Sequence, residues 1–224
     1  MTINVTPIPK LTSFATPTVT IGATASAGTA DTVIRSDSTI AGVGLITSVD
    51  DTIARYNGTG GQLQGYTSGA PTVSDTGAML KPGQPAFLAY LNANQNNVTG
   101  SGTVAQINFN AEVYDQTNNF ASYAFTAPVT GKYLLSASIY LDGRTTSASQ
   151  VLIEITTTKR RYIRQDGLGS GTSSFGIEMT TIADMDATDT AVVKVMTAGE
   201  SGDTVDILGN GTLMHTFFSG ALLV

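Results

Sequence analysis

The sequence predicts an all-β protein, and both its composition and its patterning lead to that class. Thr and Ser fill 35 and 18 of the 224 positions. Thr is β-branched and stiff at χ1, which favours pleated strands over helices. The 24 glycines supply the positive-φ positions that tight turns need. We expect an extended N-terminal arm, a thin β-region and a β-sandwich head.

Composition also excludes several classes of protein. The absence of Cys rules out a disulfide scaffold and any cysteine-ligated zinc or iron–sulfur site. A net charge of −6 repels phosphate, so no nucleic-acid partner is expected. The longest apolar runs, such as residues 221–224, are far shorter than the roughly 18–20 residues that span a bilayer, so no membrane insertion is expected. The N-terminal residues do not form a secretory signal pattern.

Residues 1–20 form the first expected region, an anchoring arm. Pro7, Pro9 and Pro17 lie in a Thr-rich stretch, which is typical of an extended chain that makes no regular hydrogen bonds of its own. Either this segment is a disordered tail, or it docks onto a partner that supplies the missing β-pairing.

Residues 21–80 form the second region, which we interpret as a β-shaft. The first eighty residues hold ten glycines, three basic residues and no Glu. Within them, residues 31–39 and 51–59 align at a period of 20, sharing Asp, Thr, Arg and Thr. A unit of this size does not bury a face alone and needs stacked or interwound neighbours.

Residues 86–224 form the third region, the head, which follows the breaker cluster at 81–85. Strand-like runs separated by turn signals recur through it, with almost no helical periodicity. This pattern indicates a sandwich or jelly roll. The expected strands cover residues 86–91, 104–110, 132–141, 151–157, 176–182, 191–197 and 213–223.

Part of the head resembles a known family. The pattern comprises Phe109, then Tyr-Asp-Gln-Thr at 114–117, Phe-Thr-Ala-Pro-Val-Thr-Gly-Lys-Tyr-Leu at 125–134, and Phe-Phe-Ser-Gly-Ala-Leu-Leu at 217–223. It resembles the tumour-necrosis-factor-like jelly roll, in particular the globular head of complement and related collagen-like proteins. Pro128 would end pairing, Gly131 would allow a sharp turn and Tyr133 would start a buried strand. Where the family often has Gly-Asp-x-Val, this chain has Asp189-Thr190-Ala191-Val192.

The region before the head resembles a second group. Residues 51–64 carry a short strand with Arg and an aromatic residue and then a Gly-Thr-Gly-Gly turn, and Asp75-Thr76-Gly77 makes an Asp-x-Gly turn. Both features are similar to shaft sequence from bacteriophage tail fibres and other virion fibres. The two resemblances together imply a homotrimer located in the virion. The apolar candidates for the trimer core are Phe87, Phe109, Tyr133, Phe217 and Phe218, which suit an intrachain core equally well.

Catalysis and metal binding find little support in the sequence. His215 is the single imidazole and is expected within the last strand, where a lone His is usually structural. No nucleophile–base motif accompanies it, so we expect no catalytic residue, no cofactor and no enzyme. Asp184, Asp186 and Asp189 offer oxygen ligands for Ca²⁺, or they form a solvated acidic loop.

Two other groups are candidates for binding a receptor or partner. The basic run holds Lys159, Arg160, Arg161 and Arg164. On a strand, Arg160, Tyr162 and Arg164 would face one way. They would grip an anionic glycan or an acidic patch, or stay solvated on an edge strand. Amides at Asn94, Asn96 and Asn97 suit the hydroxyls of a host-surface glycan, and they also form ordinary turns.

The sequence thus predicts a non-enzymatic phage virion protein with a shaft and a jelly-roll head. Attachment to the host surface as a fibre or knob is the first functional hypothesis. Capsid decoration by a cement protein of the same architecture is the alternative, and the short chain suits it because receptor-binding tail fibres are often much longer. A secreted lectin-like module is a further alternative.

Overall fold

The computed structural model describes residues 55–56, 63–64, 69–167 and 173–224, and every regular element in them is a β-strand. The all-β class is therefore confirmed. In the described part of the chain no helix is long and apolar enough to cross a membrane. Pro7, Pro9, Pro17 and the repeat at 31–39 lie outside the described residues.

The chain divides into two compact units. In the first, β1 (Arg55–Tyr56) pairs with β2 (Leu63–Gln64) as an antiparallel ladder. The second unit includes Tyr66–Val224. It begins with a hairpin of β3 (Thr72–Val73) and β4 (Met79–Leu80). Gly77 in the turn has a φ of 83°, which is the left-handed conformation that glycine adopts at little cost.

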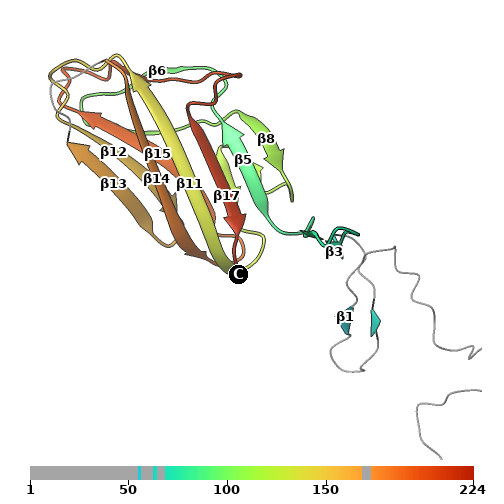
Figure 1. Ribbon diagram of the computed structural model, residues 1–224. Helices are drawn as coiled ribbons and strands as arrows, with labels where there is room; N and C mark the ends of the chain where they lie inside the picture. The colour runs from blue at the N-terminus through green and yellow to red at the C-terminus, as the bar shows by residue number, and fades with distance from the viewer. Residues whose placement is uncertain (1–54, 57–62, 65–68, 168–172) are drawn as a thin grey trace, which may run out of the picture. The chain divides into compact units, whose positions relative to one another are not determined.

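The remaining strands form the head, and its two sheets are shown in Figure 1. They are β5 (Ala86–Tyr90), β6 (Gln95–Thr99), β7 (Val104–Gln106), β8 (Ala111–Asp115), β9 (Phe120–Ala121), β10 (Ala124–Thr126), β11 (Gly131–Asp142), β12 (Gln150–Thr157), β13 (Arg161–Gly167), β14 (Phe175–Met185), β15 (Thr190–Ala198), β16 (Val205–Ile207) and β17 (Phe217–Leu222).

Strand order identifies the architecture. One sheet runs β6-β16-β11-β17-β5-β8, with β14 on the other edge of β11, and the second runs β13-β12-β15-β10-β9, with β7 beside β15. All their pairings are antiparallel. The chain crosses between the sheets after β6, β7, β8, β10, β11, β13, β14 and β15. The consecutive strands β9–β10 and β12–β13 form hairpins within one sheet. The head is a jelly-roll β-sandwich.

Aromatic side chains fill the space between the two sheets at the β5 side. The Phe87 ring stacks on Phe125 with ring centroids 4.6 Å apart and meets Phe218 edge-on at 5.0 Å. Phe109 and Tyr133 are buried in the same core. Four of the five trimer-core candidates therefore belong to the intrachain core, and only Phe217 points to the outside of its sheet, half-buried.

The expected strands are found, with corrections at their ends. The run at 104–110 is a strand only as far as Gln106, because its last four residues continue as a connection with Ile107 and Phe109 buried in the core. The last strand begins at Phe217, so His215 precedes it. Sequence periodicity does not mark the short strands β6, β8, β9, β10 and β16, since short segments carry little apolar alternation. The basic run considered on a strand lies partly in β13, which begins at Arg161.

Gly131 serves another purpose than the expected sharp turn. It is the first residue of β11 and its φ is not in the left-handed region. A Cβ there would lie 2.5 Å from the carbonyl oxygen of Val224 and 2.6 Å from Leu222 Cδ1. Glycine is thus required because the C-terminal strand passes so close.

Candidate functional site

The outer face of the sheet that contains β11, β17 and β5 is the main candidate for an interaction surface. Residues of these strands alternate between the core and this face. Leu88, Tyr90 and Phe217 point outward and are half-buried. Cross-strand pairing extends the face to β14 at one edge and β8 at the other.

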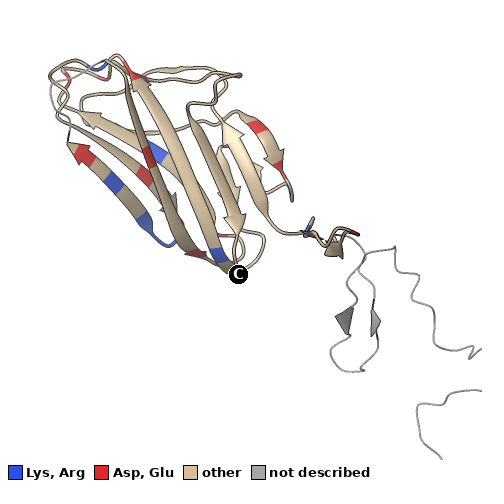
Figure 2. Ribbon diagram, in the orientation of Figure 1, with Lys and Arg blue, Asp and Glu red and all other residues tan. Residues whose placement is uncertain are grey.

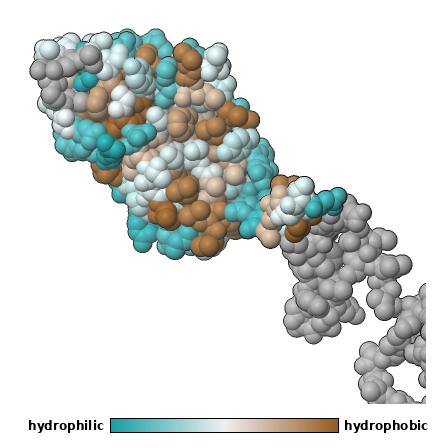
Figure 3. All heavy atoms as spheres, in the orientation of Figure 1, coloured by the Kyte–Doolittle hydropathy of each residue, from teal (hydrophilic) through white to brown (hydrophobic). Residues whose placement is uncertain are grey.

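This outer face is almost without charge. Cross-strand pairing arranges its side chains in three successive rows. The first row comprises Ile182, Leu134, Ala221 and Ala86, and the second comprises Thr180, Ser136, Ser219, Leu88 and Tyr114. The third row comprises Glu178, Ser138, Phe217 and Tyr90. Within these rows only Glu178, at the β14 edge, is charged. In Figure 2 β17 and β5 carry no red or blue, and Figure 3 shows brown apolar patches interrupted by white on the same view. We call these three rows the neutral face.

His215 lies beside the neutral face. Its ring stacks on Tyr140 of β11, with centroids 5.2 Å apart and an interplanar angle of 26°. Ser138 donates a hydrogen bond to the His215 carbonyl oxygen at 3.3 Å. The imidazole therefore contributes to an aromatic surface.

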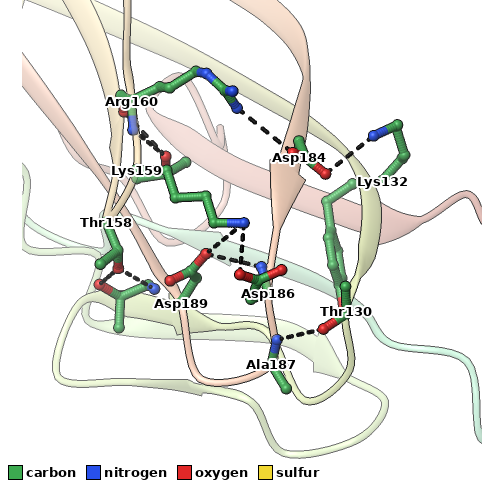
Figure 4. Close-up of polar contacts among 12 residues, drawn as sticks. Thr130, Lys132, Thr158, Lys159, Arg160, Asp184, Asp186, Ala187 and Asp189 are labelled. Atoms are coloured by element: carbon green, nitrogen blue, oxygen red, sulfur yellow. Dashed lines mark hydrogen bonds and ion pairs between the residues drawn. The ribbon is translucent and has the colours of Figure 1, made fainter.

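The basic run and the acidic loop meet each other at the end of the head that holds the C-terminus (Figure 4). Lys159 Nζ lies 2.8 Å from Asp186 Oδ2 and 3.8 Å from Asp189 Oδ2. Asp184 forms ion pairs with Lys132, whose Nζ lies 3.0 Å from Oδ1, and with Arg160, whose Nη1 lies 3.7 Å from Oδ2. Among the described residues, no group of three or more acidic or His side chains is arranged to hold a metal ion.

These contacts favour the charged state on both sides of the cluster. The hydrogen bond from Lys132 lowers the pKa of Asp184, and the hydrogen bond to Asp186 raises the pKa of Lys159. Each of the three carboxylates that are calcium candidates already faces a cationic side chain. In addition, Asp189 Oδ2 accepts a hydrogen bond from the Asp186 backbone N–H at 2.8 Å. Calcium would have to displace ammonium and guanidinium groups.

The other two basic candidates are also paired. Arg161 forms a bidentate ion pair with Glu154, whose side chain is 1% exposed. The hydrogen bond from Arg161 lowers the pKa of Glu154. Arg164 contacts Asp166 at 3.1 Å and donates to the Glu178 carbonyl oxygen of β14 at 3.2 Å.

The expectation of one basic stripe on a strand is only partly met. Lys159 and Arg160 lie in the turn before β13, which begins at Arg161. Tyr162 packs against the core, and Arg164, on the same side, reaches from β13 to an edge strand of the opposite sheet. The four basic side chains thus point in different directions, because their acidic partners lie on different elements.

The amide candidates lie at the opposite end of the head. Asn94 Oδ1 accepts a hydrogen bond from the Gly209 amide at 2.9 Å. Asn97 has a φ of 54° and donates its backbone N–H to Asp206 at 2.7 Å, and Asn96 is exposed. The structure therefore separates the amide candidates from the Lys159–Arg160 turn, which shares its end of the head with the C-terminus.

Sequence reasoning did not single out the neutral face, although a signal for it exists. Residues 86–91 read Ala-Phe-Leu-Ala-Tyr-Leu, and residues 217–223 are equally poor in charge. A strand that is apolar on both of its faces is typical of burial on both sides. In a two-layer sandwich one side of each sheet faces away from the core, so this signal indicates a partner.

Comparisons with known proteins give matches at the level of structure. No protein-family model matches the chain, and no curated protein matches it. The globular domain of zebrafish complement 1qA is similar at 14% identity and a TM-score of 0.45, covering 62% of this chain and 98% of that one. Murine APRIL at pH 5.0 is 12% identical with a TM-score of 0.44, and the match covers 62% of this chain and 99% of that one. Eiger TNF from S. frugiperda is 13% identical with a TM-score of 0.45, and the match covers 63% of this chain and 93% of that one.

Proposed function

We propose that this protein is a homotrimeric virion fibre or knob, without enzymatic activity, whose jelly-roll head attaches the particle to a host surface. The observation that carries self-association is the neutral face. Leu88, Tyr90 and Phe217 expose apolar surface to water in a single protomer, and burial of such surface stabilises by about 25 cal/mol per Å². Interfaces are also depleted of charge at their core.

We propose a trimer rather than another oligomer because of the two family resemblances in the sequence. The virion location rests on the fibre-like residues 51–64 and 73–79, of which β1, β2 and the β3–β4 hairpin are described. In this proposal the arm at 1–20 joins other virion proteins and the head projects.

The mass of the full chain in solution tests self-association. Sedimentation equilibrium should give three times the 23.1 kDa of the chain. Replacing Leu88 by Glu puts a charge in the middle of the neutral face and should yield a folded monomer. The matched control is Leu152→Glu, another half-buried outward leucine, on β12 of the other sheet, and it should keep the trimer. A wild-type monomer, or equal dissociation by both variants, would contradict the proposal.

Capsid decoration by a protein of the same architecture is the alternative function, and a secreted lectin-like module is a further one. Electron microscopy of particles with the head labelled separates the first two. Label at the tail or on projecting fibres supports attachment. Label spread over the capsid shell supports decoration, and particles without label would leave only the secreted module.

A further inference from the structure

Six amide side chains gather at one end of the head, where the β5–β6, β7–β8 and β16–β17 connections meet. We call this group the amide cluster. Five of its members are exposed and the glutamine is half-buried. The members are Asn92, Asn94, Gln95, Asn108, Asn110 and Asn210, and none is charged.

Hydrogen bonds fix how three of these amides point. Asn110 Oδ1 accepts from the Asn92 backbone N–H at 2.9 Å, and Asn94 Oδ1 accepts from Gly209 at 2.9 Å. Asn210 Oδ1 accepts from the two amides that follow it at 212 and 213, at 2.7 and 2.9 Å. A backbone N–H only donates, so the atom it meets must be the side-chain oxygen. The NH₂ groups of Asn94, Asn110 and Asn210 consequently point away from these bonds.

The connections that carry the cluster are locked together. The Asn210 backbone N–H donates to the Leu91 carbonyl oxygen at 2.9 Å. A Cβ on Gly209 would lie 2.5 Å from the Ala93 carbonyl oxygen, and glycine alone allows that approach. The donors are therefore held in place before any ligand arrives, which reduces the entropy cost of binding.

The cluster faces away from the end where the chain enters the head. Ala86, the first residue of β5, pairs with Ala221 near the C-terminus, whereas Tyr90 at the other end of β5 pairs with Phe217. The amide cluster continues from that second end, the upper end in Figure 1. Leu213 and Met214, 59% and 39% exposed, lie in the same β16–β17 connection.

We propose that the amide cluster binds an uncharged glycan. Fixed NH₂ donors match the hydroxyl and acetamido oxygens of a sugar, and the exposed Leu213 and Met214 match the apolar C–H face of its ring. An anionic glycan finds no Lys or Arg within the cluster. This inference rests on the proposed attachment function and names its ligand class.

The test measures binding of the full chain to immobilised neutral oligosaccharides of glucose, galactose, mannose and N-acetylglucosamine, with heparin as the anionic comparison. At least one neutral probe should bind, with little dependence on salt. Heparin binding alone, or no binding to any neutral probe, overturns the proposal.

Variants assign the binding to the cluster. Asn94→Asp and Asn110→Asp keep an oxygen for the backbone N–H and remove the NH₂ donor, so the loops should stay folded while the Kd of the double variant rises about tenfold or more. Asn118→Asp makes the change of charge of each single variant in the exposed β8–β9 turn and should bind like wild type. Equal binding by all variants overturns the assignment. The mass and particle location are read independently, so a failure here is distinct from a failure of the proposed function.

Discussion

Single glycines in the head act through close approach as well as through backbone conformation. Gly199 directly follows β15 and has a φ of 104°. A Cβ there would lie 2.2 Å from the Ser147 carbonyl oxygen and 2.7 Å from the Ser149 amide nitrogen. Both neighbours are backbone atoms, so a side-chain rotation does not relieve the clash. Gly202, nearby, has open space around it, with Thr204 Cγ2 at 4.0 Å.

We expect Gly199→Ala to lower the free energy of unfolding by about 1–3 kcal/mol, because both the strained φ and the contact must be accommodated. Thermal or urea denaturation measures this loss. Gly202→Ala is the matched control and should change stability little. Equal stability of the two variants would show that the loops adapt freely.

A second residue-scale prediction concerns Glu154. Its buried carboxylate is held by Arg161, and its pKa is lowered by that hydrogen bond. A carboxyl group with a lowered folded-state pKa stabilises fully above its unfolded pKa of about 4.3, and this contribution is lost as pH falls through the folded-state value. Glu154→Gln should therefore cost about 1–3 kcal/mol at neutral pH, and the difference from wild type should shrink in acid. Urea titrations across pH measure it.

The control for this prediction is Glu112→Gln on β8, whose side chain is exposed, which should have little effect at either pH. A difference between wild type and Glu154→Gln that stays constant down to strongly acidic pH would contradict the linkage.

At the scale of elements, ion pairs link the β12–β13 turn, the β14–β15 turn and the start of β11. Lys159 Nζ lies between Asp186 and Asp189, and Lys132 meets Asp184 (Figure 4). Lys132, Asp184 and Asp186 are about half exposed, whereas Asp189 is 13% exposed. The pairs made by the exposed side chains add little to stability. The main consequence of these ion pairs is that the basic side chains and the aspartates already bind one another, so neither group is free to bind a ligand.

We therefore expect millimolar calcium to leave the thermal midpoint of the wild-type protein unchanged relative to EDTA, because cationic groups already face the three aspartates. Differential scanning calorimetry in the two buffers tests this. The comparison variant is Lys159→Gln, which removes the ammonium group that lies between Asp186 and Asp189. A midpoint several degrees higher in calcium for the wild type would instead support a metal site.

At the scale of the whole molecule, candidate groups gather at the two ends of the head and on one of its faces. The ion-paired cluster shares an end with the C-terminus, the amide cluster occupies the other end, and the neutral face runs between them along β11, β17 and β5. In the proposed fibre, the arm at 1–20 binds the particle and the amide cluster binds the host glycan.

Removal of residues 1–20 should leave the number of copies in the oligomer unchanged and abolish incorporation into particles, since we propose that self-association resides in the head and anchoring in the arm. Sedimentation and quantitative blotting of purified particles measure the two effects. Incorporation at the wild-type level would refute the anchoring arm, and loss of the trimer would move the association surface out of the head.

The sequence by itself determined the all-β class and the approximate positions of the long strands, because β-branched residues, glycine turns and alternation are local properties. It also supplied the candidate basic, acidic and amide groups. Only the tertiary structure decided how they are used, since ion pairing depends on which turns meet in space. Lys159 and Asp186 are far apart in the chain and 2.8 Å apart in the fold. Tertiary packing also distinguishes Phe217 from Phe218. Adjacent residues point to opposite faces of a strand, and the packing of the two sheets buries Phe218 in the core and leaves Phe217 on the neutral face.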